Sequence, residues 1–144
     1  MKEADDHFLH ECLFFTANRL GRAITKMAED AFAPTGLSPM YGYLIRLVVG
    51  TPGITQKELA EKLSVAPSTL TRFVDKLEIR KLVERKVQGK TVLVYPTAKG
   101  EGMVETIKQA SRDLHSRYDG ILGKAFATEL SKQLVFTSGE LEKG

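Results

Sequence analysis

Residues 54–85, ITQKELAEKLSVAPSTLTRFVDKLEIRKLVER, restrict the fold more than any other part of the chain. Thr55-Gln56-Lys57-Glu58 fits a capping box, in which the threonine and glutamate side chains satisfy each other's free backbone amides. A short helix should follow, and Ser64-Val65-Ala66 should form a tight turn. Pro67 is well placed near the start of a longer helix that reaches about Arg80. The segment therefore predicts two short helices joined by a tight turn.

The longer of these helices has two chemically different faces. Its apolar residues follow the i, i+3, i+4, i+7 spacing of a buried face and are Leu70, Phe73, Val74 and Leu77. Small hydroxyl side chains and cations occupy the other face, namely Ser68, Thr69, Thr71, Arg72 and Lys76. One face should therefore be held in a core while the other is presented outward.

A β-hairpin should follow the second helix. Leu82-Val83-Glu84-Arg85 begins a first strand, Gln88-Gly89-Lys90 forms the turn, and Thr91–Pro96 is rich in the β-branched and aromatic residues of a second strand. Gly89-Lys90-Thr91 also matches the end of a phosphate-binding P-loop. That motif requires an earlier glycine, where Glu84 stands, and a following helix, where a strand is predicted, so nucleotide binding is disfavoured.

Helices flank this segment on both sides. An apolar stripe predicts a long first helix from about Ala4 to Ala33. Ser38 and Pro39 suit the N-cap and first position of a helix that ends at Gly50-Thr51-Pro52-Gly53. One further helix should follow Thr97-Ala98-Lys99-Gly100 and run to about Leu122, and a last helix should run from about Lys124 to Leu141. The expected fold class is mainly α with a small β-hairpin wing.

Composition limits the remaining classes of protein. A chain of 144 residues with 42% apolar side chains can form one domain with a real core. No apolar run approaches a membrane span, the acidic, polar N-terminus is unlike a signal peptide, and one cysteine allows no internal disulfide, so a cytoplasmic protein is expected. The net charge of +3 is only mildly basic, but Lys76–Lys90 holds a concentration of cations.

This arrangement is well suited to double-stranded DNA. A major groove about 12 Å wide accepts one α-helix. The outward face of the second helix can then present Ser68, Thr69, Thr71, Arg72 and Lys76, with Arg72 the best candidate for recognising guanine. The hairpin can lie along the backbone or enter the adjacent minor groove, and Arg85, Lys86 and Lys90 supply charge for phosphates.

LAEKLSVAPSTLTRFVDKLEIRKLVERK followed by VLVYPTAKG resembles the core of MarR-type transcriptional regulators. The shared features are the leucine pattern, Thr71-Arg72, Val-x-Arg at 83–85 and Thr-x-Lys-Gly at 97–100, and the flanking helices match as well. The resemblance implies a homodimer with dimerisation helices at 1–36 and 101–144 around a winged helix-turn-helix core at 37–100. It also implies a pseudo-palindromic operator and a repressor released by a small ligand or oxidant.

Two positions differ from the pattern of that family. The family's wing is commonly longer with an Asp-x-Arg turn, whereas here Lys90 is the cation nearest to that arginine, so phosphate contact is expected of the wing. Lys81 stands where the family often has glycine. If Lys81 must adopt a left-handed conformation, the strain should be roughly 1 kcal/mol.

The first two helices contain candidates for effector recognition. By resemblance, Phe14, Phe15, Tyr41, Tyr43 and Arg46 could line a ligand pocket, although each could equally be a packing residue. Cys12 could sense peroxide, as a cysteine on this helix does in some family members. Neighbouring apolar side chains favour the alternative that it is a small buried hydrophobe. His7, His10 and Glu11 could share a helical face but are more typical of solvated charge, so no metal site is predicted.

Two other classes of function remain as alternatives. A winged helix can also serve as a protein-binding adaptor without sequence-specific DNA binding, which the cationic face of the second helix disfavours. A small enzyme would need convergent acid, base or nucleophile residues, and no such set is found. We therefore expect no catalytic residues and no cofactor. The partners expected are an operator duplex, a second copy of the chain and a small-molecule effector, with no membrane.

Overall fold

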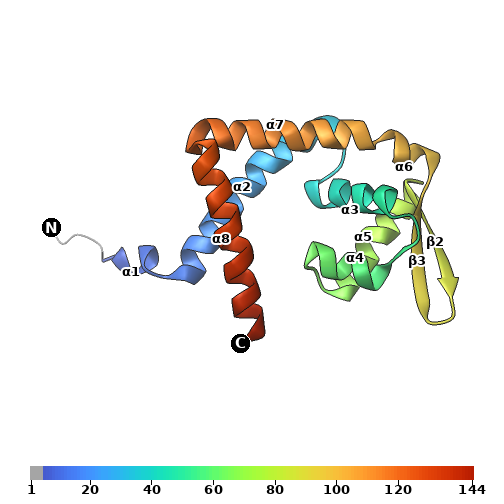
Figure 1. Ribbon diagram of the computed structural model, residues 1–144, viewed down its shortest axis with the longest axis horizontal. Coiled ribbons are helices and arrows are strands. Elements are labelled where there is room, and N and C mark those ends of the chain that lie inside the picture. Colours follow the sequence, from blue (N-terminus) through green and yellow to red (C-terminus); the bar gives the residue numbers. More distant parts are fainter. Residues whose placement is uncertain (1–4) are drawn as a thin grey trace.

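The computed structural model describes residues 5–144 and is mainly helical, with one small sheet. Figure 1 shows α7 (Val104–Leu122) running across the top of the molecule, above α3 (Pro39–Gly50), with α2 (Leu13–Phe32) and α8 (Lys124–Lys143) at one end. At the other end lie α4 (Gln56–Leu63), α5 (Pro67–Ile79), β2 (Val83–Gln88), β3 (Thr91–Pro96) and α6 (Ala98–Gly102). The expected fold class, a winged helix-turn-helix core flanked by long terminal helices, is confirmed.

The first long helix is interrupted, which the sequence did not predict. A short α1 (His7–His10) ends at Glu11, and Cys12 has an extended backbone before α2 begins at Leu13. No residue of α1 is buried, so little packing opposes the break. A short 3-10 turn, η1 (Ala33–Thr35), then follows α2. The predicted start at Ala4 lies outside the described residues.

The N-caps predicted at Ser38 and Thr55 are confirmed, but the described residues show no hydrogen bond from the Thr55 amide to the Glu58 side chain, the other half of the predicted capping box. The Ser38 hydroxyl accepts a hydrogen bond from the Tyr41 amide at 3.4 Å, and Pro39 is the first residue of α3. The Thr55 hydroxyl accepts from the Glu58 amide at 3.0 Å. Such caps satisfy amides that a helix leaves free at its first turn. They fix where α3 and α4 begin.

A third strand, which the sequence did not predict, completes the sheet. β1 (Ile54–Thr55) pairs antiparallel with β3, so the strand order is β1-β3-β2. Ile54 faces Val94 across this ladder, and both side chains are buried. Two residues are too few for a sequence pattern. The extra strand nevertheless ties the start of α4 to the middle of β3.

One continuous core joins the two ends of the molecule. Phe32 from α2, Leu44, Ile45 and Val48 from α3, and Ile107 from α7 are fully buried together with the inner residues of α4, α5 and the sheet. The α5 residues Leu70, Val74 and Leu77 are fully buried, and Phe73 packs edge-on against Tyr41 with ring centroids 5.1 Å apart. Within residues 5–144, no helix combines the length and apolarity needed to cross a membrane.

Candidate nucleic-acid interface

The chain turns sharply between α4 and α5 at Ser64, whose backbone is in the left-handed helical conformation. Ser64 has φ 55° and ψ 46°, and the amides of Ser64 and Val65 donate to the carbonyls of Glu61 and Ala60 at 3.2 and 3.0 Å. These bonds satisfy carbonyls that the end of α4 would leave free. Pro67 then opens α5 after Ala66. The expected helix-turn-helix is therefore formed by residues 56–79.

The outer face of α5 carries the side chains predicted to meet DNA. Ser68, Thr71, Arg72 and Lys76 are exposed and Thr69 is half-buried. The Arg72 guanidinium lies 3.5 Å from the Thr69 hydroxyl. Among the described residues, no carboxylate forms a salt bridge with Arg72 or Lys76. Both cations therefore remain available to an external anion or acceptor.

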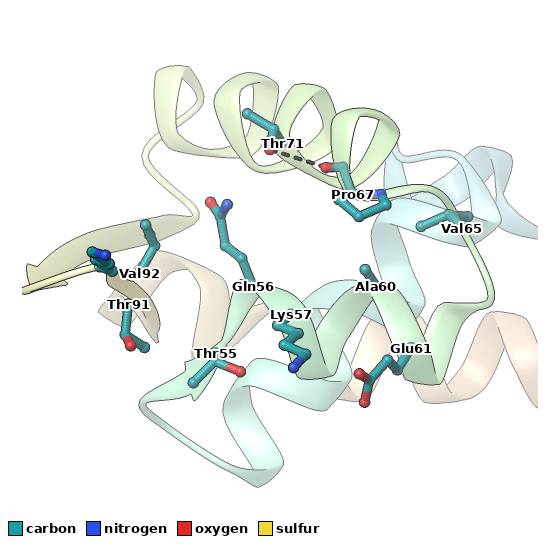
Figure 2. Close-up of a pocket in the computed structure, with 11 residues that line it drawn as sticks. Thr55, Gln56, Lys57, Ala60, Glu61, Val65, Pro67, Thr71, Thr91 and Val92 are labelled. Atoms are coloured by element: carbon teal, nitrogen blue, oxygen red, sulfur yellow. Dashed lines mark hydrogen bonds between the residues drawn. The ribbon is translucent and has the colours of Figure 1, made fainter.

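The Thr71 hydroxyl is partly committed within the helix. It donates to the Pro67 carbonyl at 3.0 Å (Figure 2). A hydroxyl has a single proton, so in this rotamer Thr71 can offer only its oxygen as an acceptor and its methyl group. Contact with a phosphate, which accepts only, is thereby disfavoured. Contact with a base amino group or with the thymine methyl stays compatible with the geometry.

Lys81 adopts the left-handed conformation considered from the sequence. Its φ is 61°, and the amides of Lys81 and Leu82 donate to the carbonyls of Glu78 and Leu77, both at 2.9 Å. This pair of bonds is a Schellman motif, which usually places glycine where Lys81 stands. The motif turns the chain sharply from α5 into β2, at a local strain of about 1 kcal/mol.

The wing is the β2–β3 hairpin, closed by the two residues Gly89 and Lys90. Gln88 pairs with Thr91, and Gly89 has φ 61°, a conformation that favours glycine in tight hairpin turns. Lys90 is exposed at the tip. Lys86 is also exposed, and its ammonium lies 4.8 Å from the centre of the Tyr95 ring. Two of the cations predicted for the wing are therefore presented to solvent.

An open groove of about 550 Å³ separates the wing from the helix-turn-helix (Figure 2). Thr71 and Lys90, predicted separately from α5 and the hairpin, line this groove together. Gln56 and Lys57, from the first turn of α4, line it too and were not predicted. Their position immediately after the Thr55 cap could have indicated a role in binding, because the free amides at the first turn of a helix point outward.

Arg85 was predicted to contact phosphates, but its guanidinium is bound within the protein. It donates to the Gln56 side chain at 2.7 Å and to the Thr71 carbonyl at 2.9 Å. It also forms ion pairs with Asp75 at 2.6 Å and Glu78 at 3.3 Å. The Arg85 amide donates to the other Glu78 oxygen at 3.0 Å. Arg85 thus joins β2 to α4 and α5, and we assign it to supporting this surface.

The five residues predicted for an effector pocket are not gathered in one place. Tyr41 packs on Phe73, and the exposed fraction of Phe14 is 77%. Tyr43 instead lines an apolar cavity of about 280 Å³ between α2, α3, α7 and α8. Arg46 lines a separate polar depression of about 540 Å³ between α3, α7 and the start of α8. We call these the apolar cavity and the cationic bay.

The apolar cavity has two aromatic hydroxyls at its wall. Tyr43 and Tyr118 line it with Leu20, Ile24, Leu114, His115, Leu122, Ala127, Leu130, Ser131 and Leu134. Burial, and secondarily the nearby Asp119 carboxylate, raise the pKa of the Tyr118 phenol above its ordinary value. The Tyr118 phenol therefore stays protonated to a higher pH than an ordinary tyrosine does.

Cys12 is half-buried at the N-cap of α2. Within residues 5–144, no hydrogen bond involves its thiol, and no group of three or more His, Cys, Asp or Glu side chains could hold a metal ion. Phe15 is half-buried on the following turn. The described residues thus gather no set of metal ligands around this cysteine.

Comparison with known proteins supports the arrangement described above. Residues 44–87 match the model of the MarR family. The HTH-type transcriptional regulator YybA of Bacillus subtilis (strain 168) is 28% identical over 94 residues, an alignment that spans 62% of this chain and 62% of YybA.

Solved structures share the fold at low sequence identity. The repressor CouR bound to a 23-mer DNA duplex has a TM-score of 0.83 at 23% identity, covering 95% of this chain and 99% of CouR. CouR from Rhodococcus jostii RHA1 bound to p-coumaroyl-CoA has a TM-score of 0.75 at 24% identity, covering 88% of this chain and 91% of CouR. The S. aureus MepR–DNA complex has a TM-score of 0.77 at 16% identity, covering 90% of this chain and 98% of MepR. At these identities the likeness establishes the fold.

Proposed function

We propose that this chain, whose residues 44–87 match the model of the MarR family, is a sequence-specific DNA-binding transcriptional regulator that acts as a homodimeric repressor. One observation carries the proposal. Thr71 on the outer face of α5 and Lys90 at the tip of the wing line one groove. Arg72 and Lys76 are exposed on the same helix, whose inner residues Leu70, Val74 and Leu77 are fully buried. An anchored helix with a free polar face is the form that enters a major groove.

The contacts that we propose follow from which donors are free. Arg72 is exposed without a carboxylate partner among the described residues, so it would recognise guanine through two hydrogen bonds. Ser68 and Thr69 would add hydroxyl contacts, and Thr71 would meet a base edge. The exposed cations Lys76, Lys86 and Lys90 would contact phosphates. Arg85 is omitted from this set because its guanidinium is already bound.

Exposed apolar side chains support the homodimer. Large hydrophobic residues of α2 and α8 remain uncovered, namely Leu13, Phe14, Leu20, Phe126, Leu134, Val135, Phe136 and Leu141. Monomeric proteins rarely expose so large an apolar surface to solvent, and such surfaces are most often buried in a two-fold symmetric dimer. We propose that residues 1–36 and 101–144 supply the dimer interface and that residues 37–100 bind DNA. The protein mass at micromolar concentration tests this, and a monomer would contradict it.

We propose that a small-molecule effector releases the repressor. CouR is solved with p-coumaroyl-CoA, and in this chain the apolar cavity lies between the long helices and α3, where a ligand could alter how the two ends of the molecule are held. An oxidant acting at Cys12 is the alternative route, and we favour the small molecule because the thiol is half-buried. The cytoplasm is the compartment that we propose, because the DNA target lies there.

Fluorescence anisotropy against the DNA upstream of the protein's own gene and a scrambled duplex, at several salt concentrations, tests the function. We expect tighter binding to the upstream duplex and a steep salt dependence. Arg72→Ala should cost roughly 1–3 kcal/mol on the specific duplex and relax its preference at one base pair. Lys90→Ala should weaken both duplexes equally and lower the salt slope by about one for each protomer.

Two results would contradict the proposal. A native protein that binds no duplex, with no salt dependence, would favour the protein-binding adaptor instead. Equal weak binding to both duplexes would mean that the operator lies elsewhere, and selection from a random duplex library would then have to recover a palindromic site. A library without enrichment would end the case for sequence-specific binding.

A further inference from the structure

Gln56, the first residue of α4, has one side-chain group that is fixed and another that is free. The Arg85 Nε donates a hydrogen bond to the Gln56 Oε1 at 2.7 Å. A guanidinium can only donate, so the atom that faces it must be the amide oxygen, and the Gln56 NH2 group must lie on the other side. Among the described residues, no hydrogen bond uses that NH2 group. Two donors of Gln56 are therefore free for a ligand.

Arg85 is itself held from several sides, so it fixes the Gln56 amide firmly. Its guanidinium also donates to the Thr71 carbonyl at 2.9 Å and forms an ion pair with Asp75 at 2.6 Å. Arg85 and Gln56 are both half-buried, which limits the competition of water for the bond between them. The Gln56 amide is thus held at a set position relative to α5 before any ligand arrives.

The side chain of Gln56 lines the groove between the wing and the helix-turn-helix. Figure 2 shows it extending from α4 into the space below α5, whereas Glu61 points away from it. Lys57 and Lys90 line the same groove, so two cations face one carboxylate there. A fixed donor in a groove with an excess of cations suits a ligand that is negatively charged and only accepts hydrogen bonds.

The backbone of a bound duplex would pass through this groove. If α5 lies in the major groove and the wing reaches toward the adjacent minor groove, the sugar–phosphate strand that separates the two grooves of the DNA runs between them. We infer that Gln56 donates a hydrogen bond to a phosphate of this strand, and that Arg85 is the positioning residue for that contact. The inference rests on the proposed function, since it requires α5 to enter a duplex.

This assignment gives Arg85 a part in DNA binding that its own charge does not play. The same guanidinium holds the Gln56 side chain and the Thr71 carbonyl. A phosphate bound at Gln56 therefore sets where the middle of α5 lies along the duplex, which is how backbone contacts fix the register of a recognition helix. Because Gln56 is neutral, its contact adds to affinity without adding to the salt slope.

Fluorescence anisotropy of the full chain with the scrambled duplex at low salt tests the phosphate contact, because such a contact carries no sequence preference. Gln56→Glu keeps an oxygen acceptor for Arg85, so it should fold, but it replaces the NH2 donors with an anionic oxygen. We expect it to bind about 10-fold more weakly for each protomer on the duplex, since a hydrogen bond to a charged group contributes about that factor. Gln109→Glu, which adds the same charge on α7 outside the groove, should bind as the native protein does.

A double-mutant cycle tests the positioning role of Arg85, at a temperature where circular dichroism shows every variant to be folded. Arg85→Gln should weaken binding about 3-fold when Gln56 is present. In Gln56→Ala the same change should cause no further loss, because no amide remains to be positioned. A residue that only stabilised the fold would weaken binding equally in both backgrounds.

The possible failures are distinguishable. If Gln56→Glu binds the scrambled duplex as tightly as the native protein does, the phosphate contact is overturned while the proposed function stands. Equal losses from Arg85→Gln in both backgrounds would overturn the positioning role. A native protein that binds neither the scrambled nor the upstream duplex would overturn the proposed function, and this inference with it.

Discussion

Replacing Arg85 with glutamine separates two roles that the sequence could not distinguish. As a phosphate contact, Arg85 would add to DNA affinity and to its salt dependence. As a support, it would hold β2 against α4 and α5 and affect mainly stability. The structure favours support, because the guanidinium is bound to Gln56, Thr71, Asp75 and Glu78.

The size of the effect follows from these contacts. The hydrogen bonds to Gln56, Thr71 and Glu78 contribute about 1 kcal/mol each, and the ion pair with Asp75 about 0.5 kcal/mol because that carboxylate is half-exposed. Water can replace the guanidinium at both carboxylates once it is removed. We therefore expect Arg85→Gln to lower the free energy of unfolding by about 2 kcal/mol. Arg85→Lys should lower the free energy of unfolding slightly less, since an ammonium keeps the positive charge but lacks the planar set of donors of a guanidinium.

Two assays decide between the roles of Arg85. Guanidinium unfolding gives the change in stability, and anisotropy at several salt concentrations gives the slope of affinity against salt. We expect Arg85→Gln to lose stability while its salt slope is unchanged. Lys86→Gln is the matched control on the next residue, for which the slope should fall by about one for each protomer. Its loss of stability should stay within about 0.5–1 kcal/mol, from the contact with the Tyr95 ring. A lower slope with native stability in Arg85→Gln would refute the reasoning.

Four further predictions concern single positions. Lys81→Gly should raise the free energy of unfolding by about 1 kcal/mol, because glycine adopts the left-handed conformation without strain, and chemical denaturation measures it. Gly100→Ala should cost about 1–3 kcal/mol because its new Cβ would overlap the Leu82 carbonyl, whereas Gly102→Ala, which meets nothing, should not destabilise. The free energy of unfolding should decline above about pH 10, because the Tyr118 phenol loses its proton more readily in the unfolded chain than in the folded protein. Denaturation at several pH values should show a smaller decline for Tyr118→Phe. Peroxide should change the DNA affinity of neither the native protein nor Cys12→Ser. If peroxide released the native protein from DNA but not Cys12→Ser, Cys12 would instead be a sensor.

Much of the fold was predictable because its signals are local. The caps at Ser38 and Thr55 and the apolar spacing in α5 depend on residues within a few positions of each other, and the structure confirms them. The break at Cys12 escaped prediction because the apolar stripe continues through it. β1 escaped because two residues carry no periodicity, and only pairing with β3 makes them a strand.

The candidate site was predictable to the extent that exposure follows from helix periodicity. Arg72 and Lys76 stand opposite the buried face of α5, so their exposure was predictable from spacing alone. Gln56 and Lys57 line the same groove only because the wing folds back against the start of α4. No pattern within one helix contains that information.

The sequence by itself determined most of the helices, the caps at Ser38 and Thr55, the hairpin and the outward face of α5, because propensity, capping and periodicity act over one or two turns of chain. Only the tertiary structure decided what each charge does. Arg85 hydrogen-bonds to Gln56 from 29 positions earlier and so becomes a support, while Arg46 lines the cationic bay together with Lys108 of α7 and Lys124 of α8. A cation has the same local pattern in either role, and its partners, brought together by packing, decide between them.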